Sequence, residues 1–183
     1  PRLVIADLNT LDTLEERDYV SGLGEVVKYG VAWDKDLFNY LEEHTGQIMQ
    51  RDKACLQHIV YECCRIKSEI VGQDEQEKGL RAVLNLGHTF GHSLEKLGGY
   101  RDHRHGEAVA MGMYSISKIG EKLGLTNNGC SEKIKEVLLQ YKLPYKLPVN
   151  INDLLNIINK DKKVLDNGLN FVLISDIGEG YIK

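Results

Sequence analysis

The sequence predicts a mainly α fold: a multi-helix domain with a small C-terminal β element. Apolar residues recur at intervals of three and four over most of the chain, which is the periodicity of an amphipathic helix. After residue 170 the pattern changes to two short β-prone runs, 171–174 and 180–182. With 183 residues the chain is long enough for one domain with a buried core, so residues 1–183 are treated as one unit.

Each element has its own local signal. The apolar run 3–6 could form a strand, but it has no partner nearby in the sequence. Helices are expected over 19–31, from 34 onward, over 52–71, from at least 85 to 97, over 107–123, over 131–141 and over 151–159. The breaks between elements are the acidic connector 74–79, Gly98-Gly99, Gly124, Pro144, Pro148 and the turn signal Asp166-Asn167-Gly168 before a C-terminal hairpin.

The bulk composition excludes several classes of protein. The formal net charge of −4 provides no basic field of the kind that binds nucleic acid. No stretch approaches the roughly 20 apolar residues that span a membrane, and no secretory signal is visible, so a cytoplasmic location is expected. The cysteines form no C-x-x-C pair and are interpreted as small buried hydrophobes in a reducing compartment: Cys55, Cys63, Cys64 and Cys130.

Histidines concentrate in one short part of the chain, since four of the six fall between positions 88 and 105. Asn85, His88 and His92 are separated by three and four residues, so a helix would place them on one face. Gly87 and Gly91 would lie on the neighbouring face, where each costs about 1 kcal/mol relative to alanine. That cost indicates a close approach by another segment. For either histidine alone, a role as a satisfied, semi-buried packing residue is the simpler interpretation.

A second short motif, which begins at His105, suggests a metal site. A pair of antiparallel helices could bring His88 and His105 together, and two imidazoles with one carboxylate can bind Zn²⁺ or a similar ion such as Co²⁺ while leaving a position for substrate. The candidate carboxylates are Glu25, Glu95 and Glu107. Glu25 is favoured because glycines and apolar residues surround it, a setting that a solvated glutamate does not need.

Several cations lie in segments that could converge on such a metal. Lys28 shares a helix face with Glu25, and Arg81 would lie one turn before Asn85 if that helix extends so far. The further candidates are Lys67, Lys162 and Lys163. A cationic pocket around a divalent ion would suit a small substrate that carries carboxylate or phosphate groups. The alternative is that these side chains are simply solvated at helix ends.

Three segments taken together resemble the 3-dehydroquinate synthase family. They are Gly-Leu-Gly-Glu-Val-Val-Lys-Tyr-Gly at 22–30; Lys67 followed by the run from Asp74 through Arg81 to His92; and His-Gly-Glu-Ala-Val at 105–109. The resemblance covers nearly the whole chain and follows the order of the C-terminal half of that family. Gly24 and Ser93 depart from it, because alanine is expected at both positions.

The resemblance implies an NAD- and metal-dependent lyase of the shikimate pathway, which leads to aromatic amino acids. Members of the family convert 3-deoxy-D-arabino-heptulosonate 7-phosphate to 3-dehydroquinate plus phosphate through transient oxidation by NAD, phosphate loss, reduction and aldol closure. They carry an N-terminal NAD-binding domain, whereas no Gly-rich dinucleotide-binding motif is present here. The chain therefore resembles an isolated C-terminal metal- and substrate-binding domain, which we expect to be inactive without that partner domain.

Roles for individual residues follow from the resemblance. It implies that Glu25, His88 and His105 are the metal ligands and that Lys67 and Arg81 meet the substrate carboxylate. The side chains implied to line the pocket for hydroxyl and phosphate oxygens are Lys28, Asn85, His92 and Lys162, with Lys163 as the alternative in the lysine doublet.

Three other functions compete with this interpretation. A related sugar-phosphate cyclase that makes an aminocyclitol or valiolone precursor would keep the metal ligands and change the residues that face the substrate. A metal-dependent polyol dehydrogenase would need no cationic pocket. A helical metal-binding or interaction domain would have no turnover at all. Pairing of two copies as a homodimer is also left open.

Overall fold

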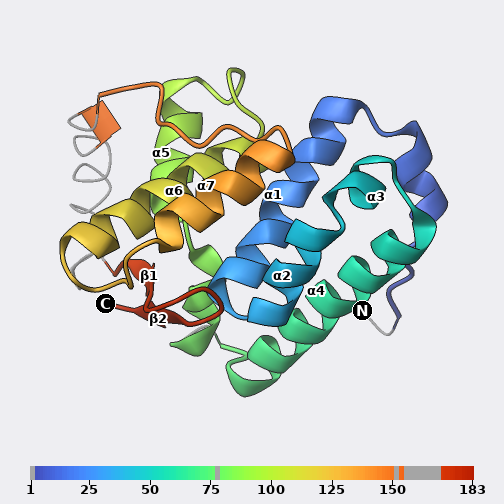
Figure 1. The fold of residues 1–183 in the computed structure, drawn as a ribbon, viewed down its shortest axis with the longest axis horizontal. Helices are drawn as coiled ribbons and strands as arrows, with labels where there is room; N and C mark the ends of the chain where they lie inside the picture. The colour runs from blue at the N-terminus through green and yellow to red at the C-terminus, as the bar shows by residue number, and fades with distance from the viewer. Residues whose placement is uncertain (1–2, 77–78, 151–152, 155–169) are drawn as a thin grey trace.

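The computed structural model describes residues 3–76, 79–150, 153–154 and 170–183, and within them the fold is mainly helical, as predicted (Figure 1). Its helical elements are η1 (Leu8–Thr13), α1 (Glu16–Ala32), α2 (Lys35–Glu43), α3 (Thr45–Met49), α4 (Lys53–Gln73), η2 (Leu80–Asn85), α5 (His88–Leu97), α6 (His105–Lys122) and α7 (Cys130–Gln140), where η marks a 3₁₀ helix. Strands β1 (Val172–Ile174) and β2 (Gly180–Ile182) follow. Among these residues, none of the helices combines the length and apolar character that a membrane span requires.

Helix α1 lies at the centre of the fold. It contacts α2 and α4 as well as α6 and α7, and Figure 1 shows it running between these two groups of helices. Val27, Val31 and Ala32 on this helix are completely buried. Neighbouring helices surround α1. A polar residue in the middle of this helix, such as Glu25, therefore faces the interior of the molecule, whereas on a surface helix it could face solvent.

The starts of α2 and α4 follow from their capping residues. The Asp34 carboxylate accepts a hydrogen bond from the Leu37 N–H at 2.9 Å, and the Asp52 carboxylate accepts one from the Cys55 N–H at 3.0 Å. Such caps satisfy backbone donors that have no partner inside the helix. Both starts agree with the boundaries expected from the sequence.

Other boundaries differ from expectation or lie outside the described residues. Helix α1 begins three residues earlier than expected, and neither the 3₁₀ helices nor α3 was anticipated. The run 3–6 forms no strand, and its side chains Leu3, Val4 and Ile5 are exposed. Of the helix expected over 151–159, only residues 153–154 are described, and they are helical. The turn signal 166–168 lies outside the described residues.

The C-terminal hairpin is present and packs onto the helices. Strands β1 and β2 are antiparallel, with Leu173 opposite Tyr181. The Thr126 hydroxyl donates a hydrogen bond to the carbonyl of Ile174 at 2.6 Å, and the N–H of Gly178 donates to the carbonyl of Val31 at 2.9 Å. A two-stranded sheet is marginal alone, so these contacts with the helices stabilise it.

The expectation that all four cysteines are buried is wrong for Cys64. Cys55 and Cys130 are buried and Cys63 is partly buried, whereas Cys64 is exposed, and all four thiols are free. The apolar stripe of α4 includes Ile59, Cys63 and Ile66, and Cys64 lies one position away from it. A step of about 100° around the helix turns that side chain toward solvent.

The C-terminal turn of α6 supplies the cap of α7. The Glu121 carboxylate accepts hydrogen bonds from the N–H groups of Gly129 and Ser131 at 3.0 and 2.8 Å and from the Ser131 hydroxyl at 2.7 Å. Burial alone would raise the pKa of this carboxyl. The three donors and the nearby Lys118 ammonium outweigh burial, so the pKa lies below its ordinary value.

Glu121→Gln is expected to lower the free energy of unfolding by about 1 kcal/mol at pH 7, because the helix loses a charged cap. A carboxyl whose folded-state pKa is depressed stabilises the protein above its ordinary pKa, here 4.5, and loses that contribution as the pH falls through the lower folded-state value. Urea unfolding at pH 7 and in steps below pH 4.5 measures the effect. The exposed Glu136→Gln variant is the control, and a parent–variant difference that stays constant with pH would contradict the assignment.

Candidate metal centre

Helix α5 begins at His88, so the continuous helix expected from Asn85 is wrong at its start. Asn85 ends the 3₁₀ helix η2, and Leu86 then leaves the helical conformation, with φ of −52° and ψ of 126°. Gly87 follows with a φ of +79°, in the left-handed region that favours glycine. Asn85 and His88 therefore belong to two different elements, and the turn at Gly87 directs the first side chain of α5.

The glycines near the histidines lie where helices approach closely, as expected from the low helix propensity of glycine. A Cβ atom on Gly87 would lie 2.6 Å from the carbonyl oxygen of Val109 in α6. A Cβ atom on Gly91 would lie 3.3 Å from the backbone of Ala108. At the other side of α6, a Cβ atom on Gly106 would lie only 1.8 Å from the carbonyl oxygen of Ser21 in α1. Backbone contact therefore places the start of α6 between α1 and α5.

Ion pairs hold the same end of α6 against α1. The Nε and Nη2 atoms of Arg17 donate hydrogen bonds to the two oxygens of the Glu107 carboxylate, at 2.7 and 2.8 Å. Glu107 also accepts a hydrogen bond from the Arg104 N–H at 2.9 Å, and the Arg104 side chain pairs with Asp18 at 2.7 Å. Glu107 was one of three candidate metal-ligating carboxylates, but these contacts give it a structural role at the helix start.

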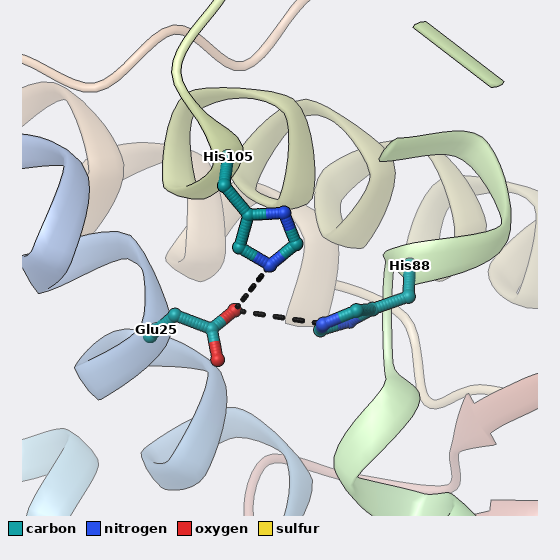
Figure 2. Close-up of side chains that lie close together, drawn as sticks. All are labelled: Glu25, His88 and His105. Atoms are coloured by element: carbon teal, nitrogen blue, oxygen red, sulfur yellow. Dashed lines mark ion pairs between the residues drawn. The ribbon is translucent and has the colours of Figure 1, made fainter. Parts of the chain in front are cut away.

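Glu25, His88 and His105 come together from three helices, α1, α5 and α6. Figure 2 shows both imidazoles directed at one carboxylate oxygen of Glu25. The Nε2 atoms of His88 and His105 each lie 3.7 Å from Glu25 Oε1, and one potential ligand atom from each residue lies within 4.8 Å of the others. A distance of 3.7 Å is too long for a hydrogen bond.

The two oxygens of Glu25 have different surroundings. Oε2 accepts a hydrogen bond from the Lys28 ammonium at 2.8 Å, and Lys28 is 3% exposed, so its charge is compensated inside the protein. Oε1 is buried and has no hydrogen-bond partner among the described residues. A buried oxygen without a partner costs roughly 1–3 kcal/mol, so its presence needs an explanation.

The histidine rings are oriented by contacts on their other nitrogens. His88 Nδ1 lies 3.3 Å from the carbonyl oxygen of Leu86, and His105 Nδ1 lies 3.2 Å from Glu95 Oε1. Both partners are acceptors, so these contacts fit the tautomer that carries its proton on Nδ1, in which the Nε2 lone pair of each ring faces Glu25. Burial, followed by the Lys28 charge, lowers the pKa of His88 to about 4, which keeps this imidazole neutral at physiological pH.

This arrangement fits a divalent cation of the zinc type. Two neutral imidazole nitrogens and one carboxylate are a common donor set for such ions at catalytic sites. Metal–ligand bonds of about 2.0–2.2 Å place ligand atoms roughly 3.4 Å apart, close to the 3.7 Å separations found here. A cation between the three residues would also provide the partner that Glu25 Oε1 lacks among the described residues. We therefore treat Glu25, His88 and His105 as the candidate metal ligands.

The candidate ligands lie in a region of the chain that matches a known protein family. The family described as 3-dehydroquinate synthase C-terminal matches residues 22–164, which include all three candidate ligands. The chain belongs to the 3-dehydroquinate synthase family. Curated relatives with that name include proteins from Geotalea uraniireducens, 46% identical over 97% of this chain, and Idiomarina loihiensis, 46% identical over 100% of it. The chain spans about half the length of these relatives, 50% and 51%.

Solved structures share the fold at lower sequence identity. A 2-epi-5-epi-valiolone synthase from Streptomyces hygroscopicus, with NAD⁺ and Zn²⁺ bound, superposes over 97% of this chain and 50% of its own, with a TM-score of 0.86 at 24% identity. A 2-deoxy-scyllo-inosose synthase complexed with carbaglucose-6-phosphate, NAD⁺ and Co²⁺ superposes over 100% of this chain and 52% of its own, with a TM-score of 0.85 at 24% identity. At this identity the likeness establishes the architecture alone.

The other residues that the family resemblance singled out lie at different distances from the candidate ligands. Lys28 contacts Glu25 directly, and the His92 ring centroid lies 5.3 Å from that of His88 and 5.9 Å from that of His105. The remaining predicted residues are Arg81 and Asn85 in η2, exposed Lys67 on α4, and Lys162 with its alternative Lys163, both outside the described residues. The roles of this second group toward a substrate stay predictions.

Two features of the site were not expected from the sequence. Glu95 was considered as a metal ligand, but it contacts the far nitrogen of His105. Its position seven residues after His88, two turns along one helix face, is a signal that could have suggested a supporting role. The pairing of Arg17 with Glu107 joins residues 90 positions apart, and no local pattern points to it.

Proposed function

We propose that this chain is the metal- and substrate-binding half of a 3-dehydroquinate synthase. The observation that carries the proposal is the buried Oε1 of Glu25, which has no hydrogen-bond partner within residues 3–76, 79–150, 153–154 and 170–183 and faces two oriented imidazoles in a chain of this family. The reaction proposed is the conversion of 3-deoxy-D-arabino-heptulosonate 7-phosphate to 3-dehydroquinate and phosphate. This step belongs to the shikimate pathway.

Glu25, His88 and His105 would hold a Zn²⁺ or Co²⁺ ion. The two structural neighbours described above, which contain Zn²⁺ and Co²⁺, support this choice. When bound, the ion supplies Lewis-acid polarisation and a template for substrate oxygens. The protein's contribution is to hold the two imidazoles and the carboxylate in place, with the Lys28 ammonium paired with the second Glu25 oxygen.

The cations and polar groups near the ligands would bind the substrate. We assign Lys67 and Arg81 to its carboxylate. The groups assigned to its hydroxyl and phosphate oxygens are Lys28, Asn85, His92 and Lys162. Such a pocket mainly orients a reactive substrate, whose own phosphate can accept the proton during elimination. Few acid or base groups of the protein are then required.

The oxidation and reduction steps need NAD, and we propose that an NAD-binding domain outside these 183 residues supplies it. The length of the relatives, about twice that of this chain, supports this division. The purified chain alone is therefore expected to form no 3-dehydroquinate, even with NAD and Zn²⁺ added. Detectable product from the chain alone would contradict the division of labour.

Substrate selectivity tests the proposal. The chain is joined behind the N-terminal half of a 46% identical relative, and the chimera is checked for cooperative unfolding and zinc content. It is expected to convert 3-deoxy-D-arabino-heptulosonate 7-phosphate and to leave sugar phosphates without a carboxylate unchanged. Arg81→Ala should raise KM for the carboxylated substrate, while the exposed Arg101→Ala variant serves as the control. Turnover of only the non-carboxylated sugar phosphates would favour another cyclase.

A further inference from the structure

His105 lies between two carboxylates from different helices. Its Nε2 faces Glu25 of α1 at 3.7 Å, and its Nδ1 lies 3.2 Å from Glu95 of α5. The His105 side chain is 45% exposed, whereas that of Glu95 is only 11% exposed. An exposed ligand therefore makes its hydrogen bond with a group that packing holds in place.

We propose that Glu95 is a positioning residue for the metal ligand His105. Glu95 accepts a hydrogen bond from the Nδ1–H of His105, holds the ring plane, and leaves the Nε2 lone pair directed toward Glu25 and His88. This inference rests on the proposed metal site and adds a residue that acts through one of its ligands. Carboxylates in this position fix the tautomer and increase the basicity of a metal-ligating histidine.

The distances favour Nδ1 as the protonated nitrogen of His105. The separation of 3.2 Å between Nδ1 and Glu95 Oε1 is within hydrogen-bond range, and a carboxylate oxygen can only accept. The separation of 3.7 Å between Nε2 and Glu25 Oε1 is outside that range, and Oε1 has no hydrogen-bond partner in the part of the chain that the structure describes. A proton on Nδ1 satisfies the observed contact, whereas a proton on Nε2 would leave both contacts unexplained.

The location of Glu95 on α5 links ligand orientation to helix packing. His88 and Glu95 are two turns apart on one face, so α5 carries one metal ligand and also the group that orients a ligand on α6. The distance between α5 and α6 is limited by the backbone contacts of Gly87 and Gly91. A rigid helix pair therefore sets the direction of the His105 lone pair, although His105 itself is exposed.

A second metal ion is the main competing interpretation of the same contacts. One potential ligand atom each from His92, Glu95 and His105 also lies within 4.8 Å of the others. An ion there would have to replace the proton on His105 Nδ1 while Nε2 binds the first ion, which turns the ring into a bridging imidazolate. The two positions therefore compete for one ring. The hydrogen bond at 3.2 Å favours the positioning role.

The tautomer of His105 tests the proposal first in the unsubstituted chain and then in one variant. In a long-range ¹H–¹⁵N correlation spectrum of the metal-free chain at pH 8, His105 is expected to show a protonated Nδ1 and an unprotonated Nε2. In Glu95→Gln, which keeps size but removes charge, the population with a protonated Nε2 should increase. A parent His105 with its proton on Nε2 would overturn the proposal, whatever the metal affinity is.

Metal affinity provides the second readout. Zinc titration in the presence of a competing chelator should show one ion in the parent, an affinity about 10–100-fold lower in Glu95→Gln, and a larger loss in Glu95→Ala. The d–d absorption bands of the Co²⁺-loaded chain should shift in both variants. The exposed Glu136→Gln variant should match the parent in affinity and spectrum. Urea unfolding without metal verifies that the variants are folded.

The outcomes separate this proposal from the metal site on which it rests. A folded parent that binds no zinc contradicts the proposed metal site, while the tautomer experiment still decides the role of Glu95. A parent that binds one ion, with unchanged affinity and spectra in both Glu95 variants, contradicts only the positioning role. Two ions in the parent, with the second lost in both Glu95→Ala and His92→Ala, would show a second metal site instead.

Discussion

Gly106→Ala is expected to lower the free energy of unfolding by about 1–3 kcal/mol and to weaken metal binding as well. The new methyl group would lie 1.8 Å from the carbonyl oxygen of Ser21, and a backbone atom cannot rotate away as a side chain can. Helices α1 and α6 must therefore separate. Because Glu25 lies one turn after Ser21 and His105 is adjacent to Gly106, the separation increases the distance between two candidate ligands.

Two other glycines provide matched controls for this substitution. A Cβ atom on Gly22 would meet nothing within 4 Å, so Gly22→Ala should be neutral or slightly stabilising, because alanine favours the helix. Gly24→Ala should be intermediate, since its Cβ atom would lie 2.5 Å from the carbonyl oxygen of Gly106. Urea unfolding and zinc titration measure both effects. Equal stability of the variants at 22 and 106 would show that α1 and α6 are not held by backbone contact.

Loss of any one candidate ligand should reduce zinc affinity by at least about 100-fold, because even partners outside the ligand set contribute 10–100-fold. The variants are Glu25→Ala, His88→Ala and His105→Ala, and the measurement is titration calorimetry together with elemental analysis. His58→Ala on α4 removes an imidazole elsewhere in the fold and should bind zinc like the parent. Parent-like affinity in one of the three variants would remove that residue from the proposed ligand set.

Stability without metal distinguishes the ligands from one another. His88→Ala should leave unfolding nearly unchanged, because the core contacts of α5 come from Phe90 and Leu94, which are buried. Glu25→Ala should cost about 2 kcal/mol, since the buried Lys28 ammonium loses the carboxylate that compensates it. Unfolding of metal-free His88→Ala under conditions where the parent stays folded would contradict this account.

Local pattern was sufficient for most of the fold. The apolar stripe of α4 and the capping residues Asp34 and Asp52 act within a few positions of the helices that they define. The expected helix from Asn85 to Leu97 was wrong at its start because the periodicity of side chains does not reveal a left-handed residue such as Gly87. The three- and four-residue spacing of Asn85, His88 and His92 continues across Gly87, although the backbone leaves the helix there.

For the site, spacing and setting predicted two histidines with one carboxylate and favoured Glu25, but they left three carboxylates as candidates. The tertiary structure separates them by what each one contacts. Glu107 is engaged by Arg17, Glu95 contacts the far nitrogen of His105, and Glu25 faces both imidazoles.

These differences depend on contacts between residues as far as 90 positions apart. Helical periodicity reports only which face of a segment is buried, and residues a few positions apart are sufficient to show it. Which side chains meet is decided by the distance and direction at which helices cross. Here the distance and direction of helix crossing are limited by backbone contacts at Gly87, Gly91 and Gly106. These contacts form only when the whole chain is packed.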